Sequence, residues 1–229
     1  MYIDPVYFLF VGPALILSLW ASWRTKSAFK KYSKVGAARG MSGAQAAQML
    51  LDRAGIRDVD VVPTRGMLSD HYNPVTKKLA LSEPVYASSS VAAVGVACHE
   101  AGHAIQHAQR YAPLWLRSTL VPTAGIGSQL GMWVMIGGLF LHSQAMVGIG
   151  AILFSAVVLF QLVTLPVEFD ASNRAKKLAF EYGIVLEQER KGMDKVLNAA
   201  ALTYVAAAVS SILTLLYFLM RAGLLGGRD

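Results

Sequence analysis

The chain has 229 residues, of which 55% are hydrophobic and only 15% are charged. Since soluble globular domains carry about 25% charged residues, this composition argues against an ordinary soluble enzyme and against a disordered chain. The single cysteine excludes an intrachain disulfide and any metal site built from several cysteines.

The first predicted element is a membrane span within residues 1–23, because residues 5–23 carry no charge. A helix of that length crosses about 28 Å, close to the hydrocarbon thickness of a bilayer. Lysine and arginine follow this stretch from Arg24 onward, whereas a cleaved signal peptide has its basic residues in front. We therefore expect a retained N-terminal anchor.

Residues 24–117 are expected to form a water-exposed region of mixed secondary structure. Ser42 is a predicted N-cap for a helix over residues 43–54, and Gly55 is its predicted stop. A small antiparallel sheet is expected next, with strands at residues 59–62, 68–72 and 79–82 and a turn at Asn73-Pro74. A helix from about Ser88 to Ala108 follows and carries the polar residues of greatest interest.

Residues 118–165 contain no formal charge over 48 residues, which is too long for one span and suits two. The turn between them is expected near residues 141–145, the most polar point of the block. Gly127 and Gly131, four residues apart, either allow close helix packing or reflect a glycine-rich chain. Residues 166–195 are expected to form a helical segment outside the bilayer, residues 196–220 a fourth span, and residues 221–229 a short tail.

The basic residues determine the expected topology. They are concentrated in residues 24–117 and 166–195, which would lie on the same side of a four-span chain. The positive-inside rule places both regions in the cytoplasm and both chain ends outside, in a multi-pass protein of the cell (inner or plasma) membrane. The net charge of +7 is then explained by topology and contact with the lipid bilayer, so no nucleic-acid partner is expected.

One motif in the central helix carries chemistry. His99, Glu100 and His103 form the pattern H-E-x-x-H. Residues four apart lie on one helix face, so both imidazoles can reach one Zn²⁺ at about 2.0–2.1 Å. Glu100 could then act as the general base on the water that the metal activates. The alternative is a helix with two buried, hydrogen-bonded histidines.

A zinc site of this type needs a third protein ligand. His142 is expected in an external turn, and His107 lies about 12 Å along the helix from His99, which favours a packing or supporting role for it. Glu168 stands out, because it follows the third span directly on the predicted side of His99. It could instead be an interfacial glutamate in contact with water and lysines. Asp170 would face away from it on a helix and could support the ligands.

Three stretches of the chain resemble the YugP-like family of bacterial membrane proteins, which are described as neutral zinc metallopeptidases. They are residues 68–74 (LSDHYNP), 98–107 (CHEAGHAIQH) and 166–172 (PVEFDAS). The resemblance covers nearly the whole chain, including the arrangement of spans. That arrangement is also similar to the HtpX-type membrane proteases, in which two spans separate the H-E-x-x-H helix from a glutamate ligand.

The resemblance implies one Zn²⁺ per chain, held by His99, His103 and Glu168, with Glu100 as the catalytic base. It departs from HtpX-type enzymes at Ser172, where those proteins usually have an aspartate that orients the first histidine. Asp170 or Asn173 is the expected substitute for that aspartate. The candidates for stabilising an oxyanion remain open and comprise His71, Tyr72, Asn173 and Arg174.

Together these features predict a mainly α integral membrane protein, with four transmembrane helices and a small cytoplasmic α+β zincin-like domain. The predicted activity is that of a zinc-dependent endopeptidase with a membrane-proximal cytoplasmic site, acting on a peptide or a membrane protein. An extended substrate could pair with an exposed edge strand, expected at residues 79–82.

Two other functions remain open. One is an intramembrane protease whose zinc helix is itself a span, although only about 13 uncharged residues precede His99 and a span needs about 20. The other is a non-proteolytic assembly factor or chaperone with a zinc site. Glu100 argues against the latter, because a structural zinc has no need of a base.

Overall fold

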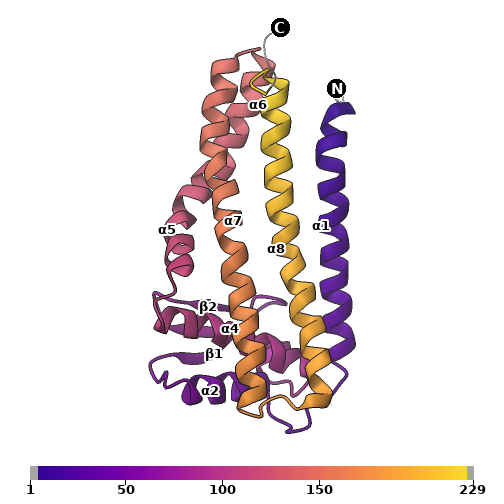
Figure 1. Ribbon diagram of the computed structural model, residues 1–229, viewed down its shortest axis with the longest axis vertical. Coiled ribbons are helices and arrows are strands. Elements are labelled where there is room, and N and C mark those ends of the chain that lie inside the picture. The colour runs from indigo at the N-terminus through magenta and orange to yellow at the C-terminus, as the bar shows by residue number, and fades with distance from the viewer. Residues whose placement is uncertain (1–4, 226–229) are drawn as a thin grey trace. The chain divides into compact units, whose positions relative to one another are not determined.

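The computed structural model describes residues 5–225, which are mainly helical with one small sheet (Figure 1). The helices are α1 (Pro5–Tyr32), α2 (Gly43–Arg53), α3 (Glu83–Tyr86), α4 (Val91–Ala108), α5 (Ala112–Ile126), α6 (Met132–Phe140), α7 (Gln144–Glu181) and α8 (Glu187–Arg221), and the π-helix η1 (Gly127–Gly131) joins α5 to α6. The strands are β1 (Asp60–Thr64), β2 (His71–Asn73) and β3 (Lys78–Ser82).

Two compact units make up the chain, and each combines segments that are distant in sequence. Unit 1 comprises Trp115–Leu165 and the described parts of Met1–Ala21 and Thr203–Asp229. Unit 2 comprises Ser22–Leu114 and Pro166–Leu202. The division into sequence domains proposed above stays a prediction.

Within residues 5–225, three helices are long and apolar enough to cross a membrane, namely α1, α7 and α8. The predicted span at the start of residues 118–165 falls on α5, η1 and α6, which follow one another directly in the chain. The π-helix divides this stretch, so no single helix within it has the length of the other three. A membrane protein with three candidate spans among the described residues is therefore supported, and the count of four stays a prediction.

Helices α6 and α7 form a helical hairpin in unit 1. Helix α6 ends at Phe140 and α7 begins at Gln144, which places the turn where it was expected. A Cβ atom at Gly131 would lie 2.8 Å from the backbone nitrogen of Phe154, and one at Gly138 would lie 2.7 Å from that of Val147. Gly127 is similarly close to the backbone of Leu153. The small residues thus allow the two arms of the hairpin to pack backbone against backbone.

In unit 2, the predicted first helix is confirmed with its cap. The Ser42 side chain accepts a hydrogen bond from the backbone of Gln45, whose side chain in turn accepts one from the backbone of Ser42. Helix α2 ends at Arg53, and Gly55 adopts a φ of +75° that lets the chain turn away. Ala46, Ala47, Leu50 and Leu51 of α2 lie in the buried core that also contains one face of α4.

The sheet differs from the prediction in two ways. Its strand order is β1-β3-β2, with β1 parallel and β2 antiparallel to β3, so it is mixed and not wholly antiparallel. The expectation that residues 79–82 form an edge strand is wrong, because they lie in the central strand β3 and are all buried. Fully apolar strands such as Leu79-Ala80-Leu81 are typical of positions covered on both faces, while Pro63 marks β1 as an edge.

Helix α4 lies at the centre of unit 2. Ser90 caps it by accepting a hydrogen bond from the backbone nitrogen of Ala93. Its small residues, including Ala97 and Ala101, are fully buried, so neighbouring elements approach its backbone closely. Helix α4 is not among the candidate spans found in the described residues, and an intramembrane site on this helix stays an untested alternative.

Candidate metal centre

Three of the side chains singled out in the sequence converge in unit 2. His99 and His103 come from α4, and Glu168 comes from the part of α7 that follows Pro166. An oxygen of Glu168, Oε2, lies 3.2 Å from Nε2 of His99 and 3.6 Å from Nε2 of His103. The candidate ligand atoms of all three residues lie within 4.8 Å of one another. The structure therefore brings Glu168 to two histidines, His99 and His103, that lie 69 and 65 positions before it in the sequence.

These distances suit a tetrahedral metal ion. Ligand atoms about 2.1 Å from a tetrahedral zinc lie about 3.4 Å from one another, and the two contacts of Glu168 fall on either side of that value. Two imidazoles and one carboxylate are also the donor set of catalytic zinc sites that leave a fourth position for water. The group of His99, His103 and Glu168 thus fits Zn²⁺ in both chemistry and spacing.

Close packing of α7 on α4 is what brings Glu168 to the histidines. Gly102 faces α7, and a Cβ atom at that position would lie 2.6 Å from the carbonyl oxygen of Ala171. Ala171 and Ala175 of α7 are fully buried, and they present little side-chain bulk. The absence of a side chain at Gly102 therefore allows α7, which carries the third candidate ligand, to pack closely against α4.

His103 is held by a residue that the sequence analysis did not single out. Gln106 is fully buried, and its Nε2 donates hydrogen bonds to the backbone oxygen of Val167 at 2.8 Å and to Asp170 at 2.7 Å. Its Oε1 must then face His103, whose Nδ1 lies 3.0 Å away. Because an amide oxygen only accepts, Nδ1 of His103 donates, and Nε2 keeps its lone pair for a metal. A polar residue three positions after His103, and so on the same helix face, was the available signal.

His99 is supported by Ser172, whose Oγ lies 3.0 Å from its Nδ1. The expectation that Asp170 or Asn173 would take this place is not met by any contact between the described residues. Asp170 instead accepts from Gln106 and pairs with Arg174 at 2.5 Å, so it supports His103 indirectly. Asn173 is exposed and lines a separate cavity with Lys176 and Lys177. A hydroxyl therefore lies beside the first histidine, where the carboxylate of Asp170 or the amide of Asn173 was expected.

The remaining candidates lie beside the centre. Nδ1 of His107 is 2.8 Å from the hydroxyl of Tyr72, which joins the end of α4 to strand β2. Burial, aided by the negative charge of Asp58, raises the pKa of Tyr72 to about 12, so its phenol stays protonated. His71 is exposed, and its Nδ1 donates to the backbone oxygen of Ser69 at 2.8 Å. Neither histidine belongs to the group that could hold a metal.

The neighbouring carboxylates favour positive charge at His103. Burial lowers the pKa of His103, but the neighbouring carboxylates of Glu168 and Glu100 outweigh this effect, and its pKa lies above its ordinary value. Glu100 itself is 8% exposed and is thus largely shielded from water. Burial raises the pKa of the Cys98 thiol to about 12, so Cys98 is a core residue and not a reactive group.

A family model described as "Putative neutral zinc metallopeptidase" matches residues 7–223. The chain belongs to this family. It is 50% identical over 216 residues to "Putative membrane protease YugP" of Bacillus subtilis (strain 168), covering 94% of this chain and 95% of that protein. No solved structure matches the chain significantly. The resemblance identified from three short stretches is therefore confirmed over almost the full length of the chain.

Proposed function

We propose that this member of the family is a membrane-embedded, zinc-dependent endopeptidase. The observation that carries the proposal is the convergence of His99, His103 and Glu168, with Glu100 one position along the same helix from His99. One Zn²⁺ per chain would occupy this group. The buried amide of Gln106 and the hydroxyl of Ser172 hold both imidazoles so that their Nε2 atoms meet the carboxylate.

Each side chain then has a chemical role. When bound, Zn²⁺ supplies an activated water and polarises the carbonyl of the scissile peptide bond. The carboxylate of Glu100 accepts a proton from the attacking water and passes it to the nitrogen of the leaving amine. The largely buried position of Glu100 keeps competing water away from this carboxylate.

Strand β2 is the proposed substrate-binding edge. It lies at one side of the described sheet, and Tyr72 within it contacts His107 of the zinc helix. An extended peptide could add to β2 through backbone hydrogen bonds, as in strand addition. The hydroxyl of Tyr72 lies against Nδ1 of His107 and keeps a lone pair that can accept a hydrogen bond from such a peptide. Peptides and segments of membrane proteins are the substrates that fit this mode.

The membrane arrangement completes the proposal. Helices α5, η1 and α6 are taken together as one span, which with α1, α7 and α8 makes four. The basic residues in 24–117 and 166–195 support a topology in which the site is cytoplasmic and near the membrane surface, with both chain ends outside.

A Glu100→Gln substitution tests the function. Purified wild type in detergent should contain one zinc per chain and cleave a quenched fluorescent peptide library, whereas Glu100→Gln should keep the zinc and lose at least about 10²-fold in turnover. Glu83→Gln, at an exposed position on α3, is the matched control and should behave like wild type. Wild type that binds no zinc after reconstitution, or equal turnover in Glu100→Gln, would contradict the proposal.

A further inference from the structure

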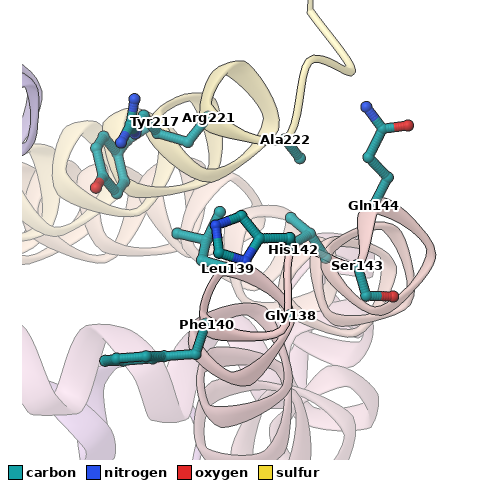
Figure 2. Close-up of a pocket in the computed structure, with 10 residues that line it drawn as sticks. Gly138, Leu139, Phe140, His142, Ser143, Gln144, Tyr217, Arg221 and Ala222 are labelled. Carbon is teal, nitrogen blue, oxygen red and sulfur yellow. The ribbon is translucent and has the colours of Figure 1, made fainter.

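Unit 1 contains a cavity of about 600 Å³ that shares no residue with the metal centre. It lies at the turn between α6 and α7, next to the end of α8 (Figure 2). Ligand-binding pockets commonly have volumes of about 300–1,000 Å³, so the cavity is large enough for a small organic group and much larger than one inorganic ion requires.

The polar side chains of the cavity suit an anion. Arg221 contributes a permanent positive charge, and His142, Ser143 and Gln144 can donate hydrogen bonds. In Figure 2 the His142 ring and the Arg221 side chain extend in the same direction from the turn and from α8. None of the described residues that line the cavity is acidic. A guanidinium with several neutral donors is a typical environment for a phosphate group.

The other walls of the cavity are apolar. Leu139, Phe140 and Val147 line it, and Phe140 is 81% exposed. Apolar walls do not stabilise a free anion, because an inorganic phosphate has no apolar surface to bury against them. An amphiphile, with a charged head and a hydrocarbon tail, matches both kinds of lining.

The position of the cavity in the fold points to the same occupant. The turn at His142 connects two apolar helical arms, and Arg221 is the last residue of α8, another candidate span. The ends of apolar helices of this kind lie at the depth of lipid headgroups. Within the described part of unit 1, only Arg117 and Arg221 carry a formal charge, so the charge at the cavity is a distinct feature of this unit.

We propose that this cavity binds the headgroup of an anionic phospholipid. The phosphate lies against Arg221 and the donors of the turn, and an acyl chain runs along Leu139 and Val147. This binding is independent of zinc and of peptide hydrolysis, so it can be tested whether or not the protease proposal holds.

The test is lipid binding by native mass spectrometry of the full chain released from detergent, titrated with phosphatidylglycerol or phosphatidylcholine. Wild type should retain phosphatidylglycerol at least tenfold more tightly than phosphatidylcholine. Arg221→Gln should lose this preference, whereas Arg117→Gln, which removes the other arginine in the described part of unit 1 and lies outside the cavity, should keep it. Equal loss in both variants, or no preference in wild type, would overturn the proposal.

A second variant guards against misfolding of Arg221→Gln. Ser143 accepts a hydrogen bond from the backbone of Met146 at the start of α7, and aspartate can take over that cap. Ser143→Asp should therefore fold normally, as judged by circular dichroism. Its carboxylate should repel an anionic headgroup and weaken the binding of phosphatidylglycerol at least tenfold. Unchanged binding by this folded variant would refute the site. Full displacement of the lipid by millimolar inorganic phosphate would reassign the cavity to a free anion and overturn the lipid assignment.

Discussion

Replacing Gly102 with alanine tests how the third ligand is brought to the zinc helix. The added Cβ would lie 2.6 Å from the carbonyl oxygen of Ala171, whereas ordinary contacts begin near 3.4 Å. Helices α4 and α7 would thus have to separate by about 0.8 Å. Ala171 is three residues from Glu168, so the carboxylate moves with the helix, and zinc–ligand distances tolerate only about 0.2 Å. We expect zinc affinity to fall at least about tenfold.

The assay is zinc retention against a graded chelator, read as metal per chain. Gly95→Ala is the matched control on the same helix, because its Cβ would meet Cγ of the Met193 side chain at 3.3 Å and come no closer than 3.9 Å to the backbone of Met193. Both substitutions gain about 1 kcal/mol of helix propensity, so a difference between them reports the clash. Overpacking at Gly102 should also cost about 1–3 kcal/mol of stability. Wild-type zinc affinity in Gly102→Ala would refute the reasoning.

Three further predictions concern the same centre. Gln106→Ala frees the Nδ1 of His103 from its acceptor and should weaken zinc about 10–100-fold in the chelator assay; unchanged affinity would contradict the orienting role. Ser172→Ala removes the contact with His99 but leaves Gln106 in place, so we expect a smaller loss of zinc affinity than in Gln106→Ala. A larger loss would mean that Ser172 contributes more to zinc binding than Gln106 does. Stripping the metal with a chelator should lower the thermal unfolding midpoint, and restoring zinc should recover it, because zinc at 100 times its dissociation constant stabilises the fold by about 2.7 kcal/mol; identical midpoints would argue against a bound ion.

Features that depend on local spacing were predictable. A helix turn of 3.6 residues places His99 and His103 on one face wherever the helix lies, so the motif alone indicated a metal site. The capping pattern at Ser42 and Gly55 similarly set the limits of α2. The charge-free stretches were long enough to indicate membrane helices, and the polar turn near His142 was visible within one of them. Each of these inferences compares residues that are close in the chain.

Features that depend on contacts between distant segments were not predictable in the same way. The hydrophobic runs suggested strands, but the central place of β3 follows from pairing with β1 on one side and β2 on the other. The π-helix η1 breaks what the composition presents as a uniform apolar stretch. Apolar composition indicates how much surface must leave water, but it does not indicate which segment of the chain packs against that surface.

The metal centre combines features that depend on local spacing with features that depend on contacts between distant segments. The sequence by itself determined the two histidines, the neighbouring Glu100 and a short choice of third ligands. Only the tertiary structure decided that Glu168 meets them, that Ser172 supports His99 and that the buried Gln106 orients His103. The physical reason is that a third ligand 65 residues away is placed by helix packing, and that packing depends on the missing side chain at Gly102 as much as on the ligand itself.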